Sequence, residues 1–331
     1  MRQKETRKRK QKKRQWLVTL LTVVCVLAAL YIFYGNAGQK GTANDHGGAL
    51  PNETSSGMEV HFIDVGQGDA TLIKADGHAM LIDAGENDKG TAVQLYLKKQ
   101  GVERLDYLVL THTDSDHIGG ADVIISKFDI GQIFLSDFKK DNKTYRELMD
   151  SMKSRNMTYS IPEVGEEYEL GNATFTIIAP NDTYEDPNNS SIALIVDYGD
   201  NSFLFSGDCE EEAERDILEN GMNIDVDVYQ AGHHGSRSSS TEEFLDAMSP
   251  AYAVISCEEK NSYGHPHAQT LNNLRARRIR VFRTDEQGSI VAYSDGAHIT
   301  WNCSPSESWQ AGEAAGRTDA SDTDNGAERK R

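Results

Sequence analysis

Two histidines and two aspartates lie within six positions of the stretch LTHTDSDHIGG, residues 110–120. The four residues are His112, Asp114, Asp116 and His117. Neighbouring carboxylates repel one another unless a cation offsets their charge, and imidazole and carboxylate groups are common ligands of divalent metal ions. The stretch therefore predicts a metal site. The glycine pair that follows lets the next segment of the chain pack closely against that site.

Further residues of the same chemical types recur along the chain. Each follows an apolar run that predicts a buried strand, and each precedes a short loop of small residues, which is how folds position functional side chains. Taken singly, each has an ordinary interpretation as a turn residue, a helix cap or part of a surface loop. Their shared pattern favours one site at one edge of a sheet. The residues are Asp83, Asp208, His233, His234, His265 and His267.

The apolar pattern predicts strands that come first in pairs and later alternate with helices. This order fits an α/β sandwich in which helices cover the outer faces of paired sheets. A Ser/Thr cap with a glutamate three positions on marks the start of one helix, in STEEFLDAMS. Strands are predicted over 58–64, 71–85 (a pair), 105–110, 130–136, 173–180, 191–198, 202–206, 226–232, 251–256 and 279–302 (two or three strands). Helices are predicted over 90–101, 120–128, 144–156, 209–221, 240–249 and 268–277.

The charge of the chain restricts its partners. The formal net charge is −18 and residues 1–15 contribute +8, so the remainder carries −26. Such a domain has no broad positive field for nucleic acid, and a phosphate ligand must be held by metal ions or a local basic patch. RARRIRVFR, residues 275–283, is one such patch, although salt bridges to the acidic surface would also explain it. The four cysteines lack the spacing of a disulfide framework or a zinc ribbon.

The N-terminal part of the chain predicts a membrane anchor. Nine Lys/Arg residues in 1–15 precede nineteen uncharged residues, Trp16 to Tyr34, which as a helix approach the thickness of a bilayer core. A cleaved signal peptide is the alternative. The predicted organisation is a basic cytoplasmic segment (1–15), a transmembrane helix (16–34), a flexible linker (35–57), the folded domain (58–303) and a disordered tail (304–331). This places the domain outside the cell, on a single-pass membrane anchor.

Seven motifs in order resemble a known family. VHFIDVGQGDATLI, LIDAG, HTDSDHIGG, FLFSGD, GHHGS, NSYGHPH and RTDEQGSI together resemble the metallo-β-lactamase superfamily. More narrowly, they resemble the hydrolase-like domain of ComEC-type DNA-uptake proteins and its free-standing relatives. The resemblance covers about residues 58–295. It implies a metallo-β-lactamase αββα sandwich, here preceded by one transmembrane helix, with one or two metal ions at one edge.

The resemblance also implies a first metal pocket of unusual composition. The superfamily usually carries the motif HxHxDH, and here Asp114 replaces the middle histidine, as ComEC-like members often show. Many members supply a further histidine from a later segment. The matching region in this chain, PNNSSIALIV, has no histidine and would offer Asn189 or Ser190. The first pocket would therefore hold His112, a carboxylate and an amide or hydroxyl group.

The second pocket implied by the resemblance is intact. Its expected ligands are Asp116, His117, Asp208 as the bridge between two ions, and His233, although the sequence does not decide between His233 and His234. Oxygen-rich ligation shifts metal preference from zinc toward manganese or magnesium. The expected cofactor is one or two divalent ions, Mn²⁺ or Zn²⁺.

The other motif residues are assigned to catalysis, structure or substrate binding. Asp116 and His265 are expected to be catalytic, and His265 would bind a phosphate or donate a proton to the leaving group. Asp83 is expected to be structural. Substrate contacts are expected from His234, Ser236, Asn189, Ser190 and His267.

Three functional hypotheses stay open. The first is a membrane-anchored, metal-dependent hydrolase, a phosphodiesterase or nuclease that acts on extracellular DNA. The second is a metal-dependent hydrolase of a carbonyl substrate such as a lactone, thioester or β-lactam. The third is a DNA-binding module with a degenerate site. The ComEC-type resemblance favours the first over the second, and the missing histidines of the first pocket favour the third.

Overall fold

The computed structural model of the chain describes residues 57–313. The predicted basic segment, the predicted transmembrane helix and nearly all of the predicted linker lie outside the described residues. Among the helices of residues 57–313, none combines the length and the apolar character needed to cross a membrane. The predicted folded domain, 58–303, lies wholly within the described part.

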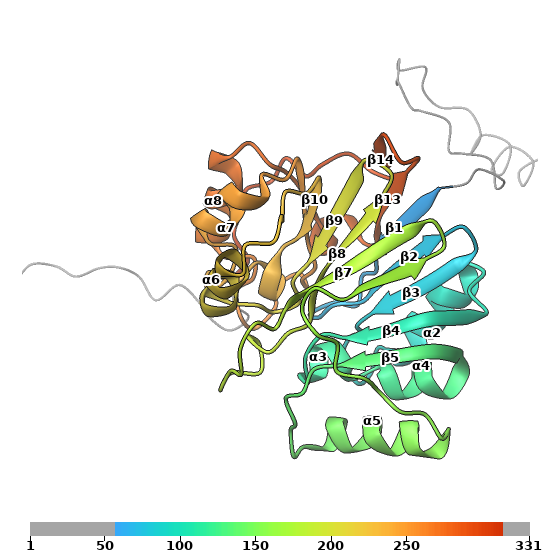
Figure 1. Ribbon diagram of the computed structural model, residues 1–331. Helices are drawn as coiled ribbons and strands as arrows, with labels where there is room; N and C mark the ends of the chain where they lie inside the picture. The colour runs from blue at the N-terminus through green and yellow to red at the C-terminus, as the bar shows by residue number, and fades with distance from the viewer. Residues whose placement is uncertain (1–56, 314–331) are drawn as a thin grey trace, which may run out of the picture. The chain divides into compact units, whose positions relative to one another are not determined.

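Two seven-stranded sheets form the centre of the domain (Figure 1). The first sheet has its β3–β4 and β4–β5 pairs parallel and its other pairs antiparallel. The carboxyl ends of β3, β4 and β5 therefore lie at one end of this sheet. In spatial order its strands are β14 (Ile299–Trp301), β13 (Ile290–Ser294), β1 (Met58–Phe62), β2 (Thr71–Ala75), β3 (His78–Ile82), β4 (Arg104–Leu110) and β5 (Asp129–Leu135).

The second sheet combines a parallel half with an antiparallel half. Strands β9 to β12 are parallel, so they too bring their carboxyl ends together. The edge strand β6 was not predicted, because it is short and its two glutamates interrupt the apolar pattern. Charged residues of this kind protect a sheet edge from pairing with another chain. The spatial order is β12 (Arg280–Arg283), β11 (Tyr252–Ile255), β10 (Val228–Gln230), β9 (Asn201–Phe205), β8 (Ala193–Tyr198), β7 (Ala173–Ala179) and β6 (Glu167–Leu170).

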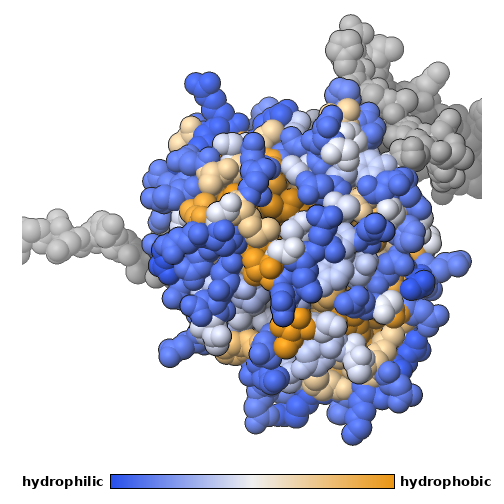
Figure 2. Space-filling view, in the orientation of Figure 1, coloured by the Kyte–Doolittle hydropathy of each residue, from blue (hydrophilic) through white to orange (hydrophobic). Residues whose placement is uncertain are grey.

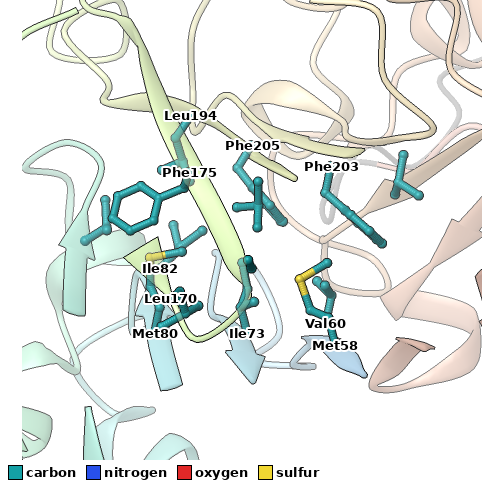
Figure 3. Close-up of a cluster of buried hydrophobic side chains, with 14 of the residues drawn as sticks. Met58, Val60, Ile73, Met80, Ile82, Leu170, Phe175, Leu194, Phe203 and Phe205 are labelled. Carbon is teal, nitrogen blue, oxygen red and sulfur yellow. The ribbon is translucent and has the colours of Figure 1, made fainter. Parts of the chain in front are cut away.

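The main hydrophobic core lies between the two sheets. Figure 3 shows side chains of β1, β2 and β3 pointing toward those of β7, β8 and β9. The rings of Phe62 and Phe205 stack across this space with their centroids 6.2 Å apart. The strand predicted over 58–64 is present as β1, and its Val60 and Phe62 side chains both face this core. Burying this apolar surface fixes the relative position of the two sheets.

Helices cover the outer face of each sheet (Figure 1). On the first sheet, α2 and α4 pack on Leu72, Leu81 and Leu108, and α5 packs beside α4. On the second sheet, α6, α7 and α8 pack on Leu204 and Tyr229. The predicted helix–sheet–sheet–helix sandwich is therefore confirmed. The helices are α2 (Gly90–Lys99), α4 (Ala121–Lys127), α5 (Lys143–Ser154), α6 (Glu211–Glu219), α7 (Glu242–Met248) and α8 (Ala268–Ala276). Shorter helical turns are α3 (Ser115–Ile118), η2 (Gly232–Gly235) and α9 (Thr284–Gln287).

Residues 304–313 lie against the domain, although the sequence assigned them to the tail. Backbone hydrogen bonds join Ser306 to Val281 (2.7 Å) and Gly312 to Pro266 (2.9 Å). Polar and glycine-rich composition predicted disorder, but backbone groups of such a segment can still bond to the edge and loops of a folded domain.

The surface of the domain is largely hydrophilic. The face shown in Figure 2 carries apolar residues only in small groups among hydrophilic ones. Among residues 57–313, the exposed large hydrophobic side chains are Leu95, Ile161 and Tyr263. Isolated exposed apolar residues are ordinary on a soluble surface. Tyr263 differs from the other two because it lies beside the candidate site described next.

Candidate metal centre

The predicted metal-ligand residues lie on loops at one end of both sheets. His112 to His117 follow β4, Asp208 follows β9, and His233 and His234 follow β10. Each of these strands runs parallel to at least one neighbour, so both sheets deliver their loops to the same region. The loop at Asp208 approaches β4 closely. A side chain on Gly207 would lie 2.9 Å from Cβ of Thr111, and its φ of 51° also favours glycine.

Four buried side chains form the compact centre of this region. They are Asp69, His117, Asp208 and His234, and one ligand atom of each lies within 4.8 Å of those of the others. Among residues 57–313 this is the one group of its kind. Asp116 lies beside it, with Oδ2 at 3.2 Å from Nε2 of His234. The centre therefore offers three carboxylates and two imidazoles.

These atoms fit a divalent metal ion. Five buried polar atoms face the centre without a hydrogen-bond partner: Asp69 Oδ1, His112 Nε2, His117 Nε2, Asp208 Oδ1 and His234 Nε2. A buried polar atom without a partner costs about 1–3 kcal/mol, so five in one place are unfavourable. A cation that binds several of them would satisfy them together. The family-implied metal therefore matches the donor atoms present.

The hydrogen bonds of two histidines leave their inner nitrogens free for a metal ion. Nδ1 of His117 donates to Oδ2 of Asp83 at 2.8 Å, and Nδ1 of His234 donates to the carbonyl oxygen of Ser256 at 3.0 Å. These partners assign the proton to Nδ1, so the Nε2 lone pairs face Asp208, at 3.2 and 3.6 Å. A carboxylate or carbonyl that holds the outer nitrogen is typical of metal-binding histidines.

Two further histidines, His112 and His233, lie near the Asp208 carboxylate. Their Nε2 atoms each lie 3.7 Å from Oδ2 of Asp208. Nδ1 of His233 lies 3.1 Å from a carboxylate oxygen of Glu210, and Nδ1 of His112 lies 3.3 Å from the hydroxyl of Ser191. Four imidazoles thus converge on Asp208, whose role as a bridge between two ions stays a prediction.

Electrostatics keep Asp208 ionised. Burial alone would raise the pKa of its carboxyl group, but His117, His234 and His233 hold that pKa well below its ordinary value. Burial raises the pKa of Asp69 to about 6. Burial also opposes the charging of His234, but Asp208 and Asp116 outweigh it and raise the His234 pKa to about 9. A bound cation competes with these protons, so metal binding is coupled to their release.

Asp83 orients the site rather than belonging to its compact group. Its carboxylate accepts hydrogen bonds from Thr111 N (2.8 Å), Thr111 Oγ1 (2.7 Å) and His117 Nδ1 (2.8 Å). Its backbone has a φ of 57°, a conformation that aspartate tolerates better than most residues. This geometry is what the predicted structural role requires.

Asn189 and Ser190, which were expected to face the site, form hydrogen bonds elsewhere. Asn189 accepts hydrogen bonds from the backbone N–H groups of Glu210 (3.0 Å) and Ala213 (3.4 Å), so it holds the start of α6. Ser190 donates to the carbonyl of Pro187 at 2.6 Å. Neither faces the metal centre, which corrects the expectation drawn from the resemblance.

Ser191 occupies the place expected for those two residues. Its hydroxyl accepts a hydrogen bond from the backbone N–H of Asp208 at 3.1 Å and also touches His112. Asp114 turns away from the compact group and pairs with Lys140. The ligand roles of Asp114 and His233 stay predictions, and the geometry places His234 rather than His233 in the compact group.

His265 reaches the site from a separate loop. Its ring centroid lies 5.5 Å from that of His233. The side-chain amide of Gln67 donates to Nδ1 of His265 at 3.5 Å, which leaves the proton on Nε2. Burial and then the imidazoles of His234 and His233 lower the His265 pKa to about 3. The ring is therefore neutral at pH 7, which argues against a proton donor and for a hydrogen bond to a phosphate oxygen.

The other predicted substrate contacts form the rim of the site. His267 accepts a hydrogen bond at Nδ1 from the backbone N–H of Arg237, at 3.0 Å. The hydroxyl of Ser236 lies 2.9 Å from that of Ser238, so it braces the same loop. Tyr263 stacks on His265 with centroids 5.5 Å apart, and 62% of its surface is exposed.

The arginine-rich stretch 275–283 is engaged in structure. Arg277 pairs with Glu242 and Asp246, and Arg283 pairs with Asp285 and Glu286. Arg275 lies over the ring of Trp309, and Arg280 over that of Tyr252. The salt-bridge interpretation of this basic patch is therefore confirmed for Arg277 and Arg283.

Sequence reasoning missed Asp69, which belongs to the compact group. Asp69 lies in the motif VHFIDVGQGDATLI, which contributed to the family resemblance but from which no ligand was predicted. Gly68 has a φ of 135°, and a side chain there would lie 2.4 Å from the backbone oxygen of Asp116. This contact brings Asp69 N within 3.1 Å of the same oxygen. The sequence did offer one signal for this ligand: Asp69 is an aspartate that directly follows a glycine, Gly68.

Comparison with known proteins places the chain in a family. Residues 63–258, more than half of the chain, match the model of the Metallo-beta-lactamase superfamily. ComE operon protein 3 of Bacillus subtilis is 31% identical over 257 residues, which are 71% of this chain and 33% of that protein. Recombination protein 2 of Haemophilus influenzae is 30% identical over 70% of this chain and 28% of that protein.

A third relative agrees with these two. Competence protein ComA of Neisseria gonorrhoeae is 32% identical over 69% of this chain and 31% of that protein. The chain thus spans about a third of the length of the curated relatives it matches. The order of the motifs, the layered fold and the match to the family model agree with one another. The chain belongs to the metallo-β-lactamase superfamily, a family of metal-dependent hydrolases, and resembles the ComEC-type competence proteins within it.

Proposed function

We propose that the domain is a metal-dependent phosphodiesterase that cleaves DNA, and most readily single-stranded DNA. The observation that carries this proposal is the rim of the metal centre. Tyr263 is exposed and stacked on His265, and Arg237 lies on the neighbouring loop. Stacking of a base on an exposed aromatic ring contributes about 1–3 kcal/mol, and a guanidinium suits a phosphate. A small lactone or β-lactam has neither a base to stack on Tyr263 nor a phosphate to bind Arg237.

Each residue of the site has a defined task in this proposal. A divalent ion held by Asp69, His117, Asp208 and His234 would supply a Lewis acid that activates water and polarises a phosphoryl oxygen. Asp83 fixes the His117 ring. These residues are buried, and they define where the phosphate must sit.

The remaining residues act on the substrate directly. Asp116 is the catalytic carboxylate of the proposal. It is more exposed than Asp208, 26% against 4% for the side chains, and it orients the attacking water. His265 donates its Nε2–H to a phosphate oxygen, and Gln67 keeps the proton on that nitrogen. The relatives' names refer to competence and recombination, and both processes involve DNA, which supports this substrate class.

We expect activity to depend on manganese. The proposed ligands are two carboxylates and two imidazoles, with the Asp116 carboxylate beside them, and oxygen ligands shift preference from zinc toward harder ions. The full-length protein, purified in detergent, should cleave a single-stranded oligonucleotide with Mn²⁺ added. EDTA should abolish cleavage, and Mn²⁺ should restore it better than Zn²⁺. Rates would be measured on the oligonucleotide, on bis-p-nitrophenyl phosphate, and on lactone, thioester and β-lactam substrates.

Two results would overturn this assignment. Preferential hydrolysis of a lactone, thioester or β-lactam would favour the carbonyl hydrolase. Tight binding of the oligonucleotide without cleavage under any metal would favour the DNA-binding module. Full activity with one tightly held zinc ion and no response to manganese would contradict the metal preference.

We also propose that residues 16–34 anchor the domain on the outer side of the cell membrane. The support is the sequence pattern of nine basic residues before an uncharged span. Protease added to intact cells should remove the domain and spare a cytoplasmic marker protein. Protection of the domain in intact cells, or a mature protein that begins after residue 34, would contradict the anchor.

A further inference from the structure

The loop that follows β10 carries two histidines of the site in an uncommon backbone conformation. His233 and His234 have φ values of 49° and 55°. Residues other than glycine seldom adopt this left-handed region, and they stay there only where the surrounding structure imposes it. Because the imidazole of His234 belongs to the compact group, whatever imposes this conformation also places a metal ligand.

Tyr229 holds the start of this loop, residues 232–241. It is the middle residue of β10 and is fully buried, and its hydroxyl accepts a hydrogen bond from the backbone N–H of Gly232 at 2.8 Å. Gly232 directly precedes His233. A side chain on Gly232 would lie 3.2 Å from the same hydroxyl, so the approach is close. The hydroxyl also lies 3.1 Å from that of Ser240, and one phenol therefore contacts both ends of the loop.

Glu214 holds the end of the same loop. Its carboxylate accepts hydrogen bonds from the backbone N–H groups of Ser240 (2.5 Å) and Thr241 (2.9 Å). Ser240 is a third residue of the loop with a left-handed φ, 57°. Glu214 is fully buried in α6, whereas Glu211 and Glu219 of that helix are exposed. A buried carboxylate is costly unless it is hydrogen-bonded, and the loop supplies those bonds.

The position of Glu214 joins two segments that carry metal ligands. Its helix, α6, begins three residues after Asp208 and contacts α7, which follows the loop of His234 (Figure 1). A further hydrogen bond joins the same two segments, because the hydroxyl of Ser239 donates to the carbonyl of Cys209 at 2.7 Å. The backbone that carries Asp208 and the loop that carries His234 are thus fixed to one another behind the site.

We propose that Tyr229 and Glu214 are positioning residues of the metal centre, which hold loop 232–241 in the conformation that turns His234 toward Asp208. Neither residue belongs to the compact group. They act on the geometry of a ligand, as the partners that surround metal ligands do. The proposal rests on the metal centre of the proposed function and does not depend on the substrate.

The affinity for manganese tests this role. Tyr229→Phe removes only the hydroxyl and leaves the N–H of Gly232 without its acceptor. Glu214→Gln keeps the volume of the side chain but turns an amide donor toward one of two backbone N–H groups. We expect each change to raise the dissociation constant of Mn²⁺ by about 10–100-fold, the usual effect of losing a partner that orients a metal ligand. The constant would be measured by isothermal titration calorimetry on full-length protein freed of metal with EDTA.

Matched variants separate positioning from general stability. Tyr184 is buried in the same apolar cluster as Tyr229, and its hydroxyl donates to Asp216 at 2.9 Å. Tyr184→Phe therefore loses a buried hydrogen bond outside the loop, and it should lower Tm without changing the manganese affinity. Glu219→Gln alters an exposed glutamate of α6 and should behave as wild type. Hydrogen exchange of residues 232–241 in the metal-free protein should be faster in Tyr229→Phe than in Tyr184→Phe.

The outcomes also separate this proposal from the proposed function. Wild-type manganese affinity in folded Tyr229→Phe and Glu214→Gln would overturn it. An equal loss of affinity in Tyr184→Phe, at a similar drop in Tm, would overturn it too, because stability alone would then explain the effect. If the two variants bind manganese weakly and the wild type binds it well, but no protein cleaves a phosphodiester, the positioning role stands and the phosphodiesterase assignment fails.

Discussion

Replacing Asp208 with alanine is expected to release bound metal and to lower phosphodiester hydrolysis by about 10³-fold or more. Four imidazoles converge on this one carboxylate, at distances of 3.2 to 3.7 Å. Without its charge, a cation in the compact group loses the ligand that all these imidazoles share. A Lewis acid contributes several kcal/mol to such a reaction, and each 1.36 kcal/mol corresponds to about tenfold in rate.

The measurement for Asp208 combines metal content with turnover. Bound manganese would be determined by mass spectrometry, and hydrolysis with bis-p-nitrophenyl phosphate. Asp225→Ala is a matched control, because Asp225 is exposed and precedes β10, whereas His233 and His234 follow that strand, and it should behave as wild type. Circular dichroism would verify that the Asp208 variant is folded. A folded Asp208→Ala protein with full metal content and full activity would refute the assignment of the centre.

Replacing His265 with alanine is expected to leave metal content unchanged and to lower kcat by about 10²–10³-fold, the usual effect of losing one positioned hydrogen-bond donor to the transition state. His265 lies outside the compact group, and its Nδ1 is held by Gln67. Its lowered pKa keeps it neutral, so its loss removes a donor without changing the charge near the metal. The two variants should therefore separate: Asp208→Ala loses metal, and His265→Ala keeps metal and loses rate.

The His265 prediction has its own controls. His298→Ala removes an exposed histidine and should have no effect on metal content or rate. The pH profile gives a second readout, because a neutral donor with a pKa of about 3 adds no ionisation near neutral pH. Were His265→Ala to lose metal as Asp208→Ala does, His265 would be a ligand. Should it abolish a descending limb near pH 6–7, the residue would act as a general acid after all.

Much of the fold could be predicted from the sequence because local pattern and tertiary role agree. Val60 and Phe62 alternate with outward residues, and both face the core between the sheets. Thr241 caps α7 through a hydrogen bond from Phe244 N, one position after Ser240, the residue that has a glutamate three positions on. The edge strand β6 escaped prediction because its glutamates meet solvent at a sheet edge, where few neighbours impose an apolar pattern.

The sequence by itself determined which loops carry the site. Asp208 and His117 follow apolar strands, and the strand pattern alone brings such residues to one end of parallel sheets. It also determined the family, because seven motifs occur in one order. These features depend on residue type and spacing along the chain.

Only the tertiary structure decided which atoms meet at the centre. His233 and His234 both have positive φ values, 49° and 55°, so no regular period tells which ring turns inward. Asp69 enters the centre through the contact of Gly68 with the loop at Asp116. Lys140 reaches Asp114 across 26 positions of sequence. Each of these outcomes depends on two loops that approach one another in space, and neither loop alone encodes its partner.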